Sequence, residues 1–424
     1  MIGANRSKGK SIMFKSHVLK AWGLGCVLAF TGGNVLAQND AGIKESLDTY
    51  KDEVNSGMGV LSSRVAALES AGQLKVTGDV RVRHEVFNQK AQSAPSTVRI
   101  ANRGRSRVRL RLGVMKQVGS EAYGAIGLAT GSTTDPTSTN QTMDANFTEK
   151  GIYVDYGFLR WTPSLAKGRI TVTGGKMKNP LLTSAVVWDG DTNPEGFAGE
   201  VKLTPKTFFR GGWLVLKENS AGREGGMNVF QFERGMRLVG LDTQLAIGYQ
   251  FVPNSNKLVG GTPDMVKQGN VKNSKSVVPD FKVIDYVLVL KKTLSNKQDV
   301  SVKLHWARNM NSFDLFSPNG VENNNENAYA IEFAYGSVKE KKDILANIRW
   351  GYIEPNAVLS MFSDSDSEYN NRKYVRVQAG YGIAQGMELD LTGFGIRRVN
   401  YDLISPRESR EILYRTQVDL VFKL

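Results

Sequence analysis

Hydrophobic and polar residues alternate along much of this chain with a period of two, which is the spacing of a β-strand. The clearest case is residues 103–112, RGRSRVRLRL, in which every second residue is an arginine and aliphatic side chains fill most positions between. A strand would place the guanidinium groups on one face and an apolar surface on the other, whereas a helix would spread the charge round its circumference. The alternating arginines are Arg103, Arg105, Arg107, Arg109 and Arg111.

A strand of this kind needs water on one side and an apolar environment on the other. The wall of a water-filled membrane barrel meets both needs, and an exposed strand of a soluble sheet is the alternative. The same alternation recurs at 74–86, 299–307, 327–335 and 413–424, and in each segment the second face is polar or small. A soluble sandwich rarely carries charges along so many strands, so the pattern favours the membrane barrel.

The connections between these segments alternate in length. Short connections are expected near 119–120, 163–168, 205–206, 234–235, 295–298, 339–342 and 385–386, and long ones near 88–102, 131–149, 178–197, 218–226, 252–281, 310–326, 355–371 and 402–410. Outer-membrane barrels have an even number of strands, with short turns on one side and longer loops on the other. The pattern therefore predicts an all-β fold, an antiparallel transmembrane barrel of sixteen strands (to within two) over residues 73–424.

Residues 1–37 have the pattern of a secretory signal peptide. Five basic residues precede the apolar run AWGLGCVLAF, and Val35-Leu36-Ala37 follows as a small-residue cleavage site, so cleavage is expected after Ala37. An uncleaved anchor is disfavoured because the apolar run is too short to span a bilayer. A lipoprotein signal ending at Cys26 is a further alternative, but that cysteine lies within the apolar run.

Removal of this segment changes the composition. The remaining chain has 50 basic and 41 acidic residues, a net charge of +9, and no cysteine, because Cys26 is the only one. Disulfides and thiol chemistry are excluded, and no metal-binding or phosphate-binding motif is present. The two histidines, His84 and His305, lie on separate strands and give no support for catalysis or a cofactor. Export, together with the lack of an aromatic and basic cluster, disfavours nucleic-acid binding.

Residues 38–72 have a different character. Apolar residues are spaced as in heptads and alternate with charged ones, which predicts a short α-helical coiled coil in the periplasm that joins copies of the chain. A single amphipathic helix lying on the following domain is the alternative. The apolar stripe consists of Ile43, Leu47, Tyr50, Val54, Leu61, Val65 and Leu68, interrupted at Gly57.

These features together resemble the Gram-negative outer-membrane porins, especially the porin-like proteins that carry a short periplasmic coiled coil before the barrel. The resemblance rests on the architecture, the arginine-rich second strand and the amphipathic last strand. It implies a bacterial outer-membrane location, a water-filled channel and, usually, a homotrimer. The chain departs from the family at its end, because Leu424 stands where Phe or Trp is usual and Phe422 lies two residues earlier.

The resemblance directs attention to a constriction inside the barrel, since many porins fold their third loop into the lumen. Here that loop is residues 178–197, with Trp188, Asp189, Asp191 and Glu195. It would face a pore-lining basic wall, and the two would create a transverse field. The alternative has these acids in ordinary surface turns. The basic wall consists of the five arginines of 103–111 with Arg81, Arg83, Arg415 and Lys423.

The sequence thus predicts a channel for passive diffusion of small hydrophilic solutes and ions, in contact with outer-membrane lipid and mildly selective for anions. One alternative is a structural or adhesive protein that tethers the envelope, with the coiled coil on peptidoglycan or a periplasmic partner. Another is a substrate-specific channel for phosphate or organic acids. The acidic segments 319–328 and 364–371 lack the spacing of a calcium loop and are interpreted as solvated.

Overall fold

The structure is a computed structural model, which describes residues 48–52, 56, 74–89, 102–218, 225–272, 278–311, 315–316, 322–323, 325–400 and 411–424. The chain divides into two units, Met1–Ser70 and Ala71–Leu424. In the first unit, residues 48–52 and 56 are helical. The signal peptide and all of the predicted heptad positions except Tyr50 lie outside the described residues, so the cleavage site and the coiled coil stay predictions.

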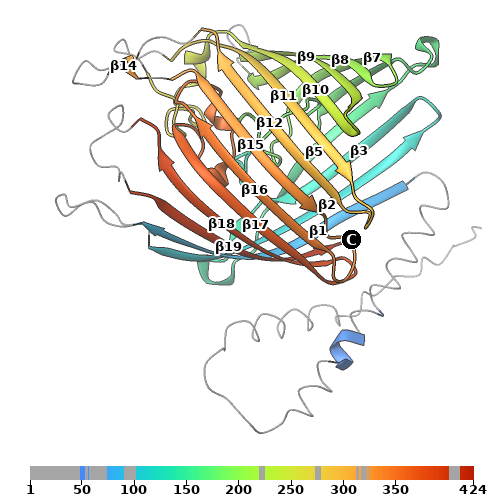
Figure 1. Cartoon of the computed structure of the whole chain (residues 1–424), viewed down its shortest axis with the longest axis vertical. Coiled ribbons are helices and arrows are strands. Elements are labelled where there is room, and N and C mark those ends of the chain that lie inside the picture. The colour runs from blue at the N-terminus through green and yellow to red at the C-terminus, as the bar shows by residue number, and fades with distance from the viewer. Residues whose placement is uncertain are drawn as a thin grey trace, which may run out of the picture. The chain divides into compact units, whose positions relative to one another are not determined.

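The second unit is a closed, antiparallel barrel of sixteen strands, as predicted (Figure 1). Alternating residues form these strands because each can turn an apolar face outward while the backbone groups pair along the wall. The strands are β1 (Leu74–Gln89), β2 (Arg103–Val118), β3 (Ala122–Thr130), β5 (Ile152–Trp161), β6 (Ile170–Lys176), β7 (Glu195–Thr204), β8 (Thr207–Lys217), β9 (Gly225–Leu238), β10 (Leu241–Val252), β11 (Phe281–Thr293), β12 (Asp299–Asn309), β15 (Asn327–Gly336), β16 (Ile344–Ile353), β17 (Arg372–Ala384), β18 (Met387–Arg398) and β19 (Leu413–Lys423).

The barrel closes where β1 pairs with both β2 and β19. Arg83 of β1 lies opposite Arg107 on one side and opposite Asp419 on the other. Every other strand pairs with its neighbours in chain order, so the ring has no free edge. The minor elements are β4 (Gln141–Thr142), which pairs with β2, the pair β13 (Leu315–Phe316) and β14 (Glu322–Asn323), and the 3-10 turns η1 (Ala145–Phe147), η2 (Ser164–Ala166), η3 (Ser255–Leu258), η4 (Ser360–Phe362) and η5 (Ser365–Ser367).

The two ends of the barrel differ. Seven short connections and both chain ends of the barrel lie at one end, here called the turn end, and eight connections lie at the other, the loop end. The predicted alternation is confirmed with one correction: the β9–β10 turn is Val239-Gly240, not 234–235. Both of these residues have positive φ, 49° and 77°, as in a two-residue hairpin turn, and the strand pattern continues past the earlier glycine to reach it.

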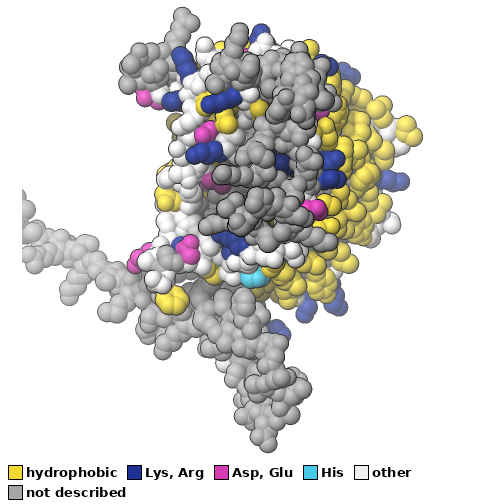
Figure 2. Space-filling model, turned by 90° about the vertical axis from the view of Figure 1, so that its left-hand side faces the viewer, with side chains coloured by type: hydrophobic (Ala, Val, Ile, Leu, Met, Phe, Trp, Pro, Cys, Tyr) yellow, Lys and Arg dark blue, Asp and Glu magenta, His cyan; other side chains and the backbone are white. Residues whose placement is uncertain are grey.

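The outer wall is apolar. Large hydrophobic side chains on the outward positions stay exposed, among them Ile126 (62%), Leu159 (73%) and Phe197 (63%). Figure 2 shows them gathered into a continuous surface on one side of the barrel. Such a surface is stable in lipid and would be a liability in water. Among the described residues, no helix has the length and apolar character needed to cross a membrane.

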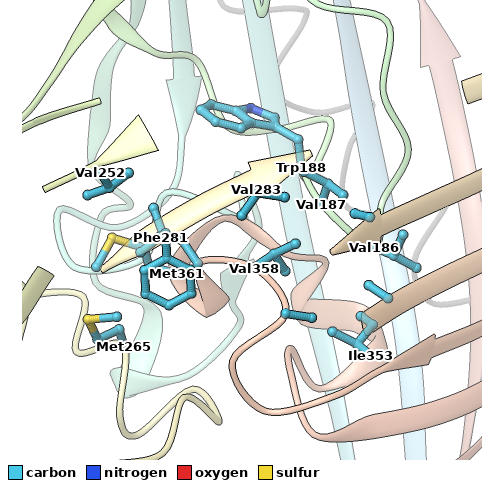
Figure 3. Packing of buried hydrophobic residues seen from close by; sticks show 14 of the residues in the cluster. Val186, Val187, Trp188, Val252, Met265, Phe281, Val283, Ile353, Val358 and Met361 are labelled. Carbon is cyan, nitrogen blue, oxygen red and sulfur yellow. The ribbon is translucent and has the colours of Figure 1, made fainter. Parts of the chain in front are cut away.

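The inside of the barrel holds an apolar core on one side. Inward residues of β8 to β18 pack against three loops, 177–194, 253–280 and 354–371, which contribute Trp188, Met265 and Met361 among others. Figure 3 shows these side chains converging on Phe281 and Val283 of β11. The described parts of these three loops therefore fold inward and fill this part of the lumen, and polar side chains line the side formed by β19, β1 and β2.

Candidate functional site in the barrel lumen

The lumen side of β19, β1 and β2 carries the predicted arginines. We define the arginine wall as the seven that are half-buried or buried there: Arg81, Arg83, Arg105, Arg107, Arg109, Arg111 and Arg415. Neighbouring strands place Arg81 opposite Arg109 and Arg83 opposite Arg107. Cations this close repel one another unless acids lie between them.

Two carboxylates of β1 lie between the arginines of β2. Asp79 accepts from the Nη2 of Arg109 at 2.7 Å and from the Nε of Arg111 at 2.6 Å. Glu85, whose side chain is fully buried, pairs with the Nε of Arg105. The arginine wall is therefore a surface of ion pairs, in which Asp79 and Glu85 of β1 each bind arginines of the neighbouring strand.

The same pattern continues onto the last strand. Asp419 of β19 accepts two parallel hydrogen bonds from Arg83, both at 2.7 Å, the geometry in which a guanidinium binds a carboxylate most strongly. Arg415 donates to Glu85 from Nη2 at 2.6 Å. These pairs join strands more than 300 residues apart in sequence.

Loop 354–371 reaches the arginine wall through Asp366. Its Oδ1 lies 2.7 Å from the Nη2 of Arg415, and its Oδ2 lies 3.0 Å from the Nη1 of Arg83. Burial acts to raise the pKa of Asp366, but the charges of Arg415 and Arg83 outweigh it and hold the pKa well below its usual range. Asp366 is therefore an ionised contact between the loop and the wall.

The prediction that segment 364–371 is solvated is wrong. Ser367, Asn370 and Asn371 are fully buried. Asn370 donates to the carbonyl oxygens of Pro355 and Val358 at 3.1 and 2.7 Å, so the amides satisfy the backbone of an inward-folded loop. Composition alone does not separate polar residues that face water from those that hold a loop together.

Loop 177–194 crosses the lumen. Asp191 lies 3.4 Å from the Nη1 of Arg111 on β2, and Ser184 contacts His305 on β12. β2 and β12 stand on opposite sides of the ring of strands. Burial opposes ionisation of Asp191, but the charges of Arg109 and Arg111 hold its pKa below the usual value.

The far end of this loop is anchored by an unexpected group of polar side chains. The Oγ of Ser184 is 2.6 Å from the Nδ1 of His305, and the Nε2 of His305 is 3.1 Å from Asp285. All three residues are buried. In addition, Gln231 exchanges two hydrogen bonds of 2.8 Å with the backbone of Leu182. The sequence indicated only that His305 lies on a different strand from His84. In the structure His305 belongs to a group of polar side chains, and we interpret its contacts as an anchor for the loop.

Loops 177–194 and 354–371 are also joined to each other. Trp188 stacks on Phe362 with ring centroids 4.7 Å apart. The backbone N–H of Asp189 donates to the carbonyl of Phe362 at 2.6 Å, and that of Asp364 donates to Ala185 at 3.0 Å. Backbone and ring contacts together make the two loops one unit, so movement of one requires movement of the other.

Two other acids of these loops, Asp189 and Asp364, have raised pKa values, in contrast to Asp191 and Asp366. Burial, together with the nearby charge of Asp364, raises the pKa of Asp189 well above its usual value. Burial and the charge of Asp366 raise the pKa of Asp364. The loop unit therefore combines carboxyl groups that favour the neutral form with ionised ones that face arginines.

The other predicted site residues lie elsewhere. Glu195 is not in the loop but is the first residue of β7, where it is exposed and pairs with Lys176 at 2.9 Å. Lys423 lies at the turn end of β19 and pairs with Glu388. Arg103 is exposed at the loop end of β2. These three are not part of the arginine wall.

The sequence pattern did not single out the acids Asp79, Glu85 and Asp419 of the wall, or a second charged network on β15 to β17. On β15 and β16, Glu332 accepts from Arg349 at 2.9 Å and from Asn347 at 2.7 Å, and Arg376 of β17 donates to Asn347 at 3.0 Å. The alternation of NAYAIEFAY marked Glu332 as inward. Its partners depend on the register between neighbouring strands, which cannot be deduced from that segment alone.

A cavity of about 490 Å³ opens beside Asp191 at the loop end. Loops 131–151 and 177–194 form most of it, and Asp155, Lys176 and Asn193 contribute polar side chains. Among the described residues, no group of three or more His, Cys, Asp or Glu side chains is placed to hold a metal ion.

Comparison with known proteins agrees with this architecture. Residues 65–210 match the model of a family described as "Putative porin". The high-pH structure of OprB from Pseudomonas putida is similar with a TM-score of 0.53 and 10% identity, over 85% of this chain and 96% of that one. A triple mutant of the Rhodopseudomonas blastica porin gives a TM-score of 0.45 and 9% identity, over 83% and 100%. No curated protein matches in sequence.

At 10% identity the likeness to OprB shows the fold. The family match and the sixteen-stranded barrel confirm the resemblance to outer-membrane porins that the sequence indicated.

Proposed function

We propose that this protein is an outer-membrane porin that lets small hydrophilic solutes diffuse passively, with a mild preference for anions. The observation that supports this most is the combination of an apolar outer wall with a lumen whose polar side carries seven arginines and five acids. The surplus of positive charge favours anions in a narrow passage. The acids are Asp79, Glu85, Asp191, Asp366 and Asp419.

The passage would run beside the arginine wall. The apolar core packs against inward residues of β8 to β18, and we propose that water and ions pass on the side formed by β19, β1 and β2. Loop 177–194, with Asp189 and Asp191, is proposed as the constriction. Glu195 is excluded from it, because this residue is exposed on β7.

Conductance of the purified protein in planar bilayers tests this proposal. We expect steady single-channel steps and a reversal potential that indicates anion selectivity in a salt gradient. A folded barrel that gives no steps would instead support a structural or adhesive role.

A substrate-specific channel for phosphate or organic acids is the second candidate. The buried Nε–H groups of Arg81 and Arg107 have no hydrogen-bond acceptor among the described residues. Buried donors normally have partners, and an oxyanion in transit would supply one. Such a channel would show saturable block of the chloride current by phosphate, whereas a general porin would not.

We further propose a homotrimer in the bacterial outer membrane, with residues 38–72 as a periplasmic coiled coil. The porin resemblance supports the trimer, and the heptad spacing supports the coiled coil. The fold and family are those of channel proteins, and we propose no enzymatic activity or cofactor.

A further inference from the structure

One arc of the outer wall carries a row of aromatic side chains on four consecutive strands. Cross-strand pairing sets four aromatic residues side by side on β11, β12, β15 and β16. The rings of the first two stack with centroids 5.4 Å apart. Aromatic residues of this kind lie at the boundary between hydrocarbon and headgroups. In order, the row is Tyr286, Trp306, Tyr329 and Tyr352.

An apolar groove of about 330 Å³ runs beneath this row. Its outward lining includes Leu304, Ile331 and Trp350, which are 37–40% exposed. Each of these residues lies two positions along its strand from the aromatic row, on the same face and nearer the turn end. Leu304 pairs with Ile331, and Ile331 pairs with Trp350. The groove therefore faces the hydrocarbon side of the aromatic row.

Basic residues border the same arc at the loop end. Lys282 and Lys373 are the second residues of β11 and β17, and Arg308 and Arg397 are the last but one of β12 and β18. All four share the outward face of their strands with exposed or half-exposed apolar residues. Lys373 lies directly opposite Tyr352 and Arg397. Four cations thus stand where headgroups would lie.

The three strands that carry the arginine wall lack this charge on their outer face. At the equivalent outward positions of β19, β1 and β2 stand Tyr414, Asn88 and Gly104, none of which is charged. A general requirement for basic residues at the membrane boundary would have placed them there too. The arc therefore differs from these three strands in charge as well as in having the groove.

Arg308 indicates the kind of partner. Its Nη2 pairs with Glu326, and its side chain is 43% exposed. An accessible guanidinium binds a phosphate oxygen readily. The groove lies two to four residues along β12 from Arg308, which is roughly 7–14 Å along the strand. An acyl chain of a lipid whose phosphate contacts Arg308 would reach the groove.

We propose that the arc formed by β11, β12, β15, β16, β17 and β18 binds a phosphorylated lipid of the outer leaflet. The phosphate would contact Lys282, Arg308 and Lys373, and an acyl chain would occupy the groove beside Trp350. Placing the loop end in the outer leaflet rests on the proposed porin function. Charge complementarity favours this occupant over a second copy of the chain, whose equivalent surface would bring the same cations together.

The test uses the mature full-length protein in detergent with diphosphoryl lipid A as the probe, and native mass spectrometry as the measurement. The variant Lys282→Gln/Arg308→Gln/Lys373→Gln should bind the probe at least about tenfold more weakly, because each basic residue near an anionic lipid contributes to binding. The matched control Lys297→Gln/Lys341→Gln/Lys342→Gln removes three exposed lysines at the turn end and should bind as the unchanged protein does.

A second probe, the same lipid without its phosphates, should bind equally weakly to all three proteins. Equal binding of diphosphoryl lipid A by the variant and the control would overturn the proposal. So would a lipid-free change of oligomer size in the variant, which would make the arc an interface between copies. If the triple variant does not fold, Lys373→Glu alone should show the loss.

The outcome is separable from that of the proposed function. The substituted residues face outward, so the variant should keep the single-channel conductance of the unchanged protein. A barrel that binds the lipid but does not conduct would overturn the porin function and leave the lipid site standing.

Discussion

Asp366 and Arg415 are joined by a 2.7 Å contact between Oδ1 and Nη2, and this contact connects loop 354–371 to the last strand of the barrel. The side chain of Arg415 is almost fully buried, so its charge depends on Asp366 and Glu85 for compensation. A loop that completes the charge balance of the wall is therefore held by the wall.

Asp366→Asn should release loop 354–371 from the wall. Removing one partner of a buried ion pair costs about 3 kcal/mol, so the free energy of unfolding should fall and single-channel conductance should rise as the loop moves. Denaturant unfolding and planar-bilayer recording measure the two effects. Asp364→Asn is the matched control, and it should have a smaller effect because the raised pKa of Asp364 already favours a neutral side chain. Equal effects of the two changes would contradict the role given to Asp366.

Replacing Arg105, Arg107, Arg109 and Arg111 together by Ser should shift ion selectivity toward cations. Asp79 and Glu85 would remain on the wall without their partners on β2, and each unit charge at about 4 Å contributes roughly 1 kcal/mol in water. The reversal potential in a salt gradient measures the shift, and heat-modifiable migration on gels checks that the barrel is folded. An unchanged reversal potential would place these arginines outside the conduction path.

Ser184→Ala should loosen the far end of loop 177–194. The lost hydrogen bond to His305 is expected to cost about 1 kcal/mol, and His305→Leu should cost more because it leaves Asp285 buried without its partner. Current noise in bilayer recordings and thermal unfolding measure the change. Thr293→Ala, which removes a hydroxyl at an exposed turn, is the control. If Ser184→Ala leaves both noise and stability unchanged, Ser184 is not an anchor.

Conductance should depend on pH through Asp189 and Asp364. Their pKa values are raised in the folded protein, so their contribution to stability is complete below the ordinary aspartate pKa of about 4 and is lost as the pH rises through the raised values. The loop unit should therefore pack more tightly in mild acid, with lower conductance, and loosen as these groups ionise.

Asp191 and Asp366 act in the opposite sense. Because their pKa values are lowered, they keep their charge and their contacts with the arginine wall until the pH falls below the ordinary pKa of aspartate. The variant Asp189→Asn should flatten the rise of conductance with pH, whereas Asp144→Asn, on an exposed side chain, should not. The same pH curve for both variants would contradict the assignment.

Deleting residues 40–70 should leave a folded, heat-modifiable barrel whose trimer is less stable. In the proposed coiled coil the heptad stripe would bury apolar surface only between chains, so its loss should lower the temperature at which the oligomer dissociates on gels. An oligomer of unchanged thermal stability would show that the segment is not an assembly device, and would direct attention to peptidoglycan or a periplasmic partner.

Much of the fold is predictable from the sequence because a membrane barrel is built from local rules. Alternation specifies which face of a strand meets lipid, and turn residues specify where it ends. The β9–β10 turn was misplaced by a glycine at 235 that competes with the true turn at Val239-Gly240.

The site was less predictable because its partners are far apart in sequence. Arg83 meets Asp419 and Arg415 meets Glu85 only when the barrel closes. The buried polar segment 364–371 has the composition of a surface loop, and its inward course depends on contacts such as that of Trp188 with Phe362. The pattern within one segment does not predict contacts with partners so distant in sequence.

The pairing of β1 with β19 also bears on how this protein reaches the membrane. A chain that lacks its last strand has two edges whose backbone groups are unsatisfied in lipid. Insertion therefore cannot begin with the first strand and continue as synthesis proceeds. We expect the barrel segment to stay unfolded until the eleven-residue strand β19 is available, which makes the pairing of β1 with β19 the step that decides whether a copy can insert.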